Sequence, residues 1–65
     1  MRGSVKRLID ELVRLRSRGN AKIVPFVRAH LVLNGIDPDA HTENTADEAD
    51  KIAVLEGMIR DFQRR

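Results

Sequence analysis

The sequence predicts an all-α protein, either a small three-helix bundle or an intertwined helical dimer. Two segments repeat apolar residues at helical spacing, a third segment is apolar on almost every face, and capping or turn-forming residues separate the three. The chain has 65 residues, of which 42% are hydrophobic and 34% charged. A chain of this length is expected to form a single domain, residues 1–65, with no room for a separate catalytic domain.

The first predicted helix spans residues 4–18. Its apolar side chains recur every three or four positions and therefore share one helix face: Val5, Leu8, Ile9, Leu12, Val13 and Leu15. Ser4 is expected to cap this helix through its hydroxyl group. Gly19 can take the left-handed conformation that ends a helix, and Asn20 is expected to cap the next one.

The second predicted helix spans residues 21–34 and is apolar on nearly all sides. Its interruptions are few: Lys22, Arg28 and His30. A helix of this kind is expected to be buried on several sides. Pro25 is compatible with the first turn of a helix. A β-strand is the weaker alternative, because Pro25 disfavours a central strand and no partner strand is visible in the sequence.

The residues after the second helix have the chemistry of a helix stop followed by a turn. Asn34 and Gly35 predict a Schellman motif, in which Ile36 folds back onto the last helical turn. Asp37 and Pro38 then predict a short helical turn.

The third predicted helix spans residues 46–63. Thr45 and Glu48 have the spacing of a capping box, which predicts a helix start at this point. The apolar residues expected to face inward are Ala49, Ile52, Ala53, Leu55, Ile59 and Phe62.

Residues 37–48 also have the spacing of a calcium-binding EF-hand loop, with oxygen-bearing side chains at several ligand positions. Three positions depart from that pattern, the first of them Pro38 at the second position of the loop. Thr42 stands where the loop requires glycine, and His41 occupies a ligand position although histidine is a poor calcium ligand. A capped acidic loop explains the segment without a metal, so we expect no metal and no cofactor.

Catalysis is not expected, because the residues that support it are few and scattered. His30 and His41 are the side chains that titrate near neutral pH, and neither has a supporting set of nucleophile or metal-binding residues. The chain has no cysteine, no glycine-rich phosphate loop and only two serines, Ser4 and Ser17. The sequence therefore predicts that this is not an enzyme, with His30 structural and His41 solvated.

The positive charge of the chain is concentrated at its start. Residues 1–22 carry seven basic and two acidic side chains, for a net charge of +5, whereas the two later thirds are weakly acidic. This charge makes the first helix a candidate nucleic-acid surface, formed by Arg7, Arg14, Arg16, Arg18 and Lys22. Nucleic-acid binding is possible but not favoured, because Phe26 and Phe62 are the sole aromatic residues and both are expected in the core.

The apolar second helix favours a protein–protein interaction or oligomerisation module, since one small chain offers little surface to cover it. The expected partner is a second copy of the chain, as a homodimer, or another protein. The residues expected at the interface are Phe26, Val27, Leu31 and Met58. No signal peptide or membrane-spanning segment is visible, so the expected location is the cytoplasm.

Overall fold

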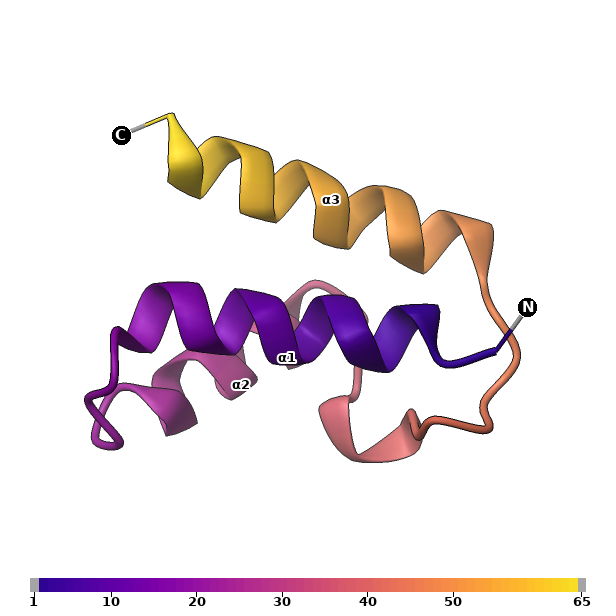
Figure 1. Cartoon of the computed structure of the whole chain (residues 1–65), viewed down its shortest axis with the longest axis horizontal. Helices are drawn as coiled ribbons and strands as arrows, with labels where there is room; N and C mark the ends of the chain where they lie inside the picture. Colours follow the sequence, from indigo (N-terminus) through magenta and orange to yellow (C-terminus); the bar gives the residue numbers. More distant parts are fainter. Residues whose placement is uncertain (1, 65) are drawn as a thin grey trace.

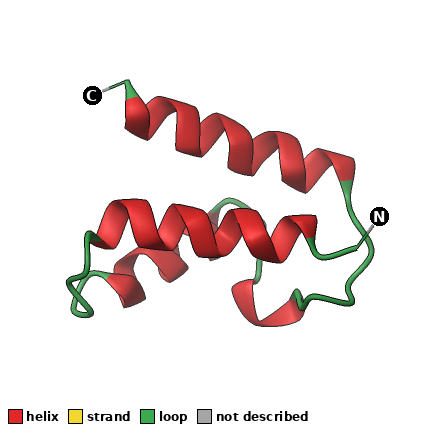
Figure 2. Ribbon diagram, viewed as in Figure 1, coloured by secondary structure: helices red, strands yellow, loops and turns green. Residues whose placement is uncertain are grey.

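The computed structural model of the protein describes residues 2–64 (Figures 1 and 2). Three α-helices and one 3₁₀ turn make up this part of the chain: α1 (Ser4–Ser17), α2 (Val24–Leu33), η1 (Pro38–Ala40) and α3 (Ala49–Gln63). Within it there is no strand, although Arg2 and Ala46 form one isolated β-bridge. The predicted all-α fold is confirmed in the form of a small three-helix bundle. Met1 and Arg65, the ends of the predicted domain, lie outside the described residues.

The bundle is built around α1, because both other helices pack on it and make little contact with each other. Figure 1 shows α1 and α3 running in the same direction, while α2 runs back along α1 in the opposite direction. Aliphatic side chains from the three helices and the loop after α2 form the core: Val5, Ile9, Leu12, Val27, Leu31, Ile36, Leu55 and Ile59. The central position of α1 therefore explains its regular apolar stripe.

The start of α1 is capped by a distant residue. Asp47 Oδ1 accepts a hydrogen bond of 3.1 Å from the backbone N–H of Ser4, and the Gly3 N–H donates to the Thr45 carbonyl at 3.0 Å. Gly3 has a positive φ of 81°, and a Cβ atom at this position would lie 2.9 Å from the carbonyl oxygen of Glu43. The predicted Ser4 cap is wrong, because Ser4 is already helical and the carboxylate of Asp47, which is distant in the sequence, accepts from its N–H.

The predicted ends of the first two helices are largely correct. The C-cap of α1 is Arg18, which has a positive φ of 49°, and Gly19 follows it with the positive φ that was expected. Asn20 Oδ1 accepts from the Lys22 N–H at 3.0 Å, but it caps a turn, because α2 begins at Val24, three residues later than predicted. The Schellman motif is confirmed by two hydrogen bonds, from the Ile36 N–H to the Leu31 carbonyl at 2.9 Å and from the Gly35 N–H to the Val32 carbonyl at 3.0 Å.

The predicted capping box is absent, and α3 begins at Ala49, three residues later than predicted. Thr45 Oγ1 accepts from the Thr42 N–H at 2.8 Å, and Glu48 pairs with Lys51 at 2.7 Å. The hydrogen bond to Glu48 raises the pKa of Lys51 above its usual value. Helix α3 begins later than predicted because hydrogen bonds hold the segment before it against the start of α1.

The inward-facing residues predicted for α3 are correct in part. Leu55 and Ile59 are buried and Ile52 and Phe62 are half-buried, whereas Ala49 and Ala53 are exposed. The short helical turn predicted at Asp37 and Pro38 is present as η1. Asp37 Oδ1 caps this turn, because it accepts a hydrogen bond from the Asp39 N–H at 2.9 Å.

His41 was expected to be solvated, and this prediction is wrong. The residue is 7% exposed, and its buried Nδ1 has no hydrogen-bond partner among residues 2–64. The loop on either side explains the burial. It is tied to η1 before His41 and to the start of α1 after it, so the imidazole is held against the body of the protein.

Candidate interaction surface

The side of α2 that points away from α1 is an exposed apolar surface. Phe26 is 73% exposed, Val32 57% and Leu33 85%, which is unusual for large apolar side chains. Exposed apolar neighbours extend this surface, and we call the whole set the outer face of α2: Ile23, Pro25, Phe26, Ala29, Val32 and Leu33. None of its members carries a charge.

The outer face exists because α2 packs on one neighbouring helix. Val27 and Leu31 are fully buried against the rest of the core, whereas α3 packs on α1 and leaves the far side of α2 uncovered. The expectation that α2 is buried on several sides is therefore wrong for the single chain. A helix is enclosed on all sides only where other elements surround it, and the short η1 turn is the other element that contacts α2.

The four residues predicted at the interface do not form one surface. Phe26 lies on the outer face, so the expectation that it belongs to the core is wrong. Val27 and Leu31 are core residues of the single chain, and Met58 is half-buried on α3. The prediction that Phe26, Val27 and Leu31 share one interface is therefore wrong. Successive residues of a helix are rotated by about 100°, which turns Val27 away from Phe26.

Sequence reasoning missed the other large members of the outer face. Leu33 lies seven positions after Phe26, about two helical turns, so both residues share one face. The same spacing could have separated this stripe from the buried one that contains Val27 and Leu31.

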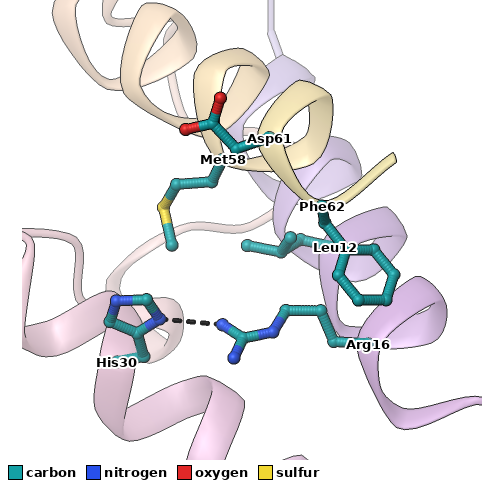
Figure 3. Close-up of a pocket in the computed structure, with 6 residues that line it drawn as sticks. All are labelled: Leu12, Arg16, His30, Met58, Asp61 and Phe62. Atoms are coloured by element: carbon teal, nitrogen blue, oxygen red, sulfur yellow. Dashed lines mark hydrogen bonds between the residues drawn. The ribbon is translucent and has the colours of Figure 1, made fainter. Parts of the chain in front are cut away.

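A pocket of about 130 Å³ opens where α2 and α3 diverge over α1 (Figure 3). Its lining comes from all three helices: Leu12, Arg16, His30, Met58, Asp61 and Phe62. Figure 3 shows the side chain of Met58 pointing toward His30, with Leu12 to one side of them, above Arg16 and next to Phe62. The pocket therefore has an apolar part, formed by Leu12, Met58 and Phe62, a polar edge formed by Arg16 and His30, and Asp61 as a further charged residue in its lining.

The polar edge of the pocket is a hydrogen bond between two helices. Arg16 Nη1 lies 2.7 Å from His30 Nδ1. A guanidinium group can only donate, so His30 Nδ1 is the acceptor of this hydrogen bond. His30 is exposed and joins α2 to α1, in agreement with the structural role expected for it.

The residues predicted to bind nucleic acid lie in three different places. Arg14, Arg18 and Lys22 are exposed at the end of the molecule where α1 finishes, and Arg16 is half-buried beside His30. Arg7 is also exposed, but it lies in the first half of α1 and does not belong to this cluster.

The end of α3 adds basic residues that the sequence analysis did not include. The Arg18 guanidinium lies 5.8 Å from the centre of the Phe62 ring, so the ends of α1 and α3 meet. Arg60 and Arg64 are exposed in the last turns of α3. We call the basic residues at these two helix ends the basic end: Arg14, Arg18, Lys22 and Arg64.

The loop with EF-hand spacing does not gather metal ligands. Asp39 pairs with Arg28 and Glu48 pairs with Lys51. Across residues 2–64, no group of three or more His, Cys, Asp or Glu side chains could hold a metal ion. In the same part of the chain, no helix combines the length and apolar character needed to cross a membrane.

The outer face of α2 and the adjoining pocket are thus the features of the described chain that its fold leaves unexplained. Comparison with known proteins adds no family to this description, since no protein family, curated protein or solved structure matches the chain significantly.

Proposed function

We propose that this protein is a non-enzymatic helical module that works by self-association, with the outer face of α2 as its interface. The observation that carries the proposal is the exposure of Phe26 and Leu33 on a helix face that has no charged side chain. Contiguous exposed apolar patches of this kind are typical of interaction sites.

The size of the outer face supports this proposal. A specific interface buries at least about 1,000 Å² in total, or about 500 Å² from each chain. That is roughly a tenth of the 4660 Å² surface of this protein, an area that one helix face with six apolar side chains can supply. A single core in a chain of this size supplies about 3–5 kcal/mol, so burial of the outer face would add substantially to stability.

A second copy of the chain is the partner that the charge distribution favours. In a two-fold symmetric contact the same surface meets itself, so any charge on it would face a like charge. The outer face of α2 has none, and Arg28, the charged residue within α2, is paired with Asp39. Self-association therefore meets no electrostatic penalty at this surface.

The experiment that tests the proposal is sedimentation equilibrium over a concentration series, with refractive-index detection because the chain has no Trp or Tyr. The wild-type chain should be a dimer that dissociates on dilution. Leu33→Asp should remain helical by circular dichroism and become monomeric. Ala53→Asp, which adds the same charge to an exposed position on α3, should behave as the wild type. A wild-type monomer up to millimolar concentration would overturn the proposal.

A second candidate function is nucleic-acid binding through the basic end. The observation that favours it is the convergence of arginines from α1 and α3, since the ends of these helices meet. Replacement of Arg14, Arg18 and Lys22 by Gln should then abolish a salt-sensitive affinity for duplex DNA. Failure of the wild-type chain to bind duplex DNA at low salt would remove this candidate. The cytoplasmic location stays a prediction.

A further inference from the structure

We propose that two copies of the chain pair through antiparallel α2 helices, and that Phe26 of each copy fills the pocket of the other. This inference rests on the self-association proposed above. It goes further by specifying the orientation of the two helices, the residues that face each other and the ligand of the pocket.

The orientation follows from the spacing of residues along one edge of the outer face. Three members of the outer face, Ile23, Phe26 and Leu33, share one narrow stripe with the adjacent His30, because the four are separated by three, four and three positions. This spacing is the same in both directions along the helix. An antiparallel two-fold pair therefore brings Phe26 opposite the partner's His30 and Ile23 opposite the partner's Leu33.

The pocket has the size and lining to accept one aromatic ring. A cavity of about 150 Å³ in a protein binds benzene, so the pocket, at about 130 Å³, has a comparable size, although it is open and its lining includes the charged Asp61. Its lining includes a thioether from Met58, a guanidinium from Arg16 and an aromatic ring from Phe62. Each of these groups makes a favourable contact with an aromatic ring.

Phe26 is the aromatic residue that the chain can offer to this pocket. The sequence contains two aromatic residues, and Phe62 already lines the pocket. Phe26 is 73% exposed, so its ring is available to a second copy.

His30 connects the stripe to the pocket, because it belongs to both. In the antiparallel pair, a ring that faces the partner's His30 lies at the mouth of the partner's pocket. A parallel pair would place Phe26 against Phe26 and leave both pockets unfilled. Of these two arrangements, the antiparallel pair is the one that both matches the stripe of each chain with that of its partner and fills the two pockets.

The test uses the absence of cysteine from the chain, which allows single cysteines to be introduced without background. Ile23→Cys and Leu33→Cys are made separately, at exposed positions. The two positions are ten residues apart, about 15 Å along a helix, whereas a disulfide requires Cα atoms within about 7 Å. Under oxidising conditions a mixture of the two variants should form the mixed disulfide, and neither variant alone should cross-link. Ala53→Cys on α3 is the control and should not cross-link.

Occupation of the pocket is tested by comparing the dimer dissociation constants of two variants, Phe26→Ala and the control Pro25→Ala, which lies on the same face. Phe26→Ala should weaken the dimer by at least about tenfold with helicity retained, because a buried aromatic anchor is removed. Pro25→Ala, which does not belong to the stripe, should leave the dissociation constant within about threefold of wild type.

The outcomes separate this inference from the proposed function. Self-cross-linking of Ile23→Cys or Leu33→Cys, or a dimer by mass that forms no mixed disulfide, would overturn the antiparallel pairing and leave self-association standing. A dimer unaffected by Phe26→Ala would overturn the filling of the pocket. A wild-type chain that is monomeric by mass would overturn both proposals.

Discussion

Phe26 and Val27 are adjacent in the sequence and opposite in burial, since Phe26 is 73% exposed and Val27 is 1% exposed. Val27 belongs to the core formed with α1, and Phe26 belongs to the outer face of α2. The apolar character of α2 therefore has two separate explanations. One half of it serves the fold of the single chain, and the other half has no partner within residues 2–64.

The first prediction separates folding from association at these two neighbours. Val27→Asp should unfold the chain, because it buries a charge without a partner in a core that supplies about 3–5 kcal/mol. Phe26→Asp should keep the helical circular dichroism signal at micromolar concentration and lose self-association. A helical, monomeric Val27→Asp variant would show that Val27 is not a core residue.

The second prediction concerns Gly3. Both Gly3 and Gly19 have a φ of 81°, so alanine at either position should cost about 1–2 kcal/mol of the free energy of unfolding. At Gly3 the new Cβ would also lie 2.9 Å from the Glu43 carbonyl oxygen, whereas at Gly19 nothing lies within 4 Å. Urea unfolding should therefore show a larger loss for Gly3→Ala than for Gly19→Ala. Equal losses would mean that the segment before α1 does not approach Glu43 as closely as described.

The third prediction concerns the long-range cap of α1. Asp47→Ala should lower the free energy of unfolding by about 0.5–2 kcal/mol, because the Ser4 N–H loses its acceptor. Asp47→Asn keeps an acceptor oxygen and should lose less. Glu56→Ala, at an exposed position within α3, is the control and should change stability by no more than about 0.5 kcal/mol. A fully stable Asp47→Ala variant would contradict the cap.

The fourth prediction is a stabilising substitution. Gly57 lies inside α3, and a Cβ atom there would meet nothing within 4 Å. Gly57→Ala should therefore raise the free energy of unfolding by about 0.5–1 kcal/mol, since alanine favours the helix over the unfolded chain. Thermal unfolding should show a higher midpoint, and a lower midpoint would indicate that this part of α3 is packed more tightly than described.

The sequence was sufficient for those features of the fold that depend on neighbouring residues. The end of α1 shortly before Gly19, the Schellman motif at Gly35 and the turn begun by Asp37 were all predicted correctly. Each is determined by the backbone preference or hydrogen-bonding capacity of two or three adjacent residues.

The features that failed depend on contacts between distant residues. Thr45 and Glu48 have the spacing of a capping box, but Thr45 is held by the start of α1 and the helix begins later. The outer face of α2 could not be assigned for the same reason. The periodicity of α2 allows either side to face the core, and the choice follows from α3 packing on α1.

The most direct test of the role of the outer face is an NMR dilution series of the wild-type chain. The side-chain resonances of Phe26, Val32 and Leu33 should shift together as the dimer dissociates. The methyl groups of Val54, which is 40% exposed on α3, should keep their positions and serve as an internal control. A spectrum that does not change with concentration, or shifts confined to Val54, would contradict the assignment of the outer face of α2 as the interface.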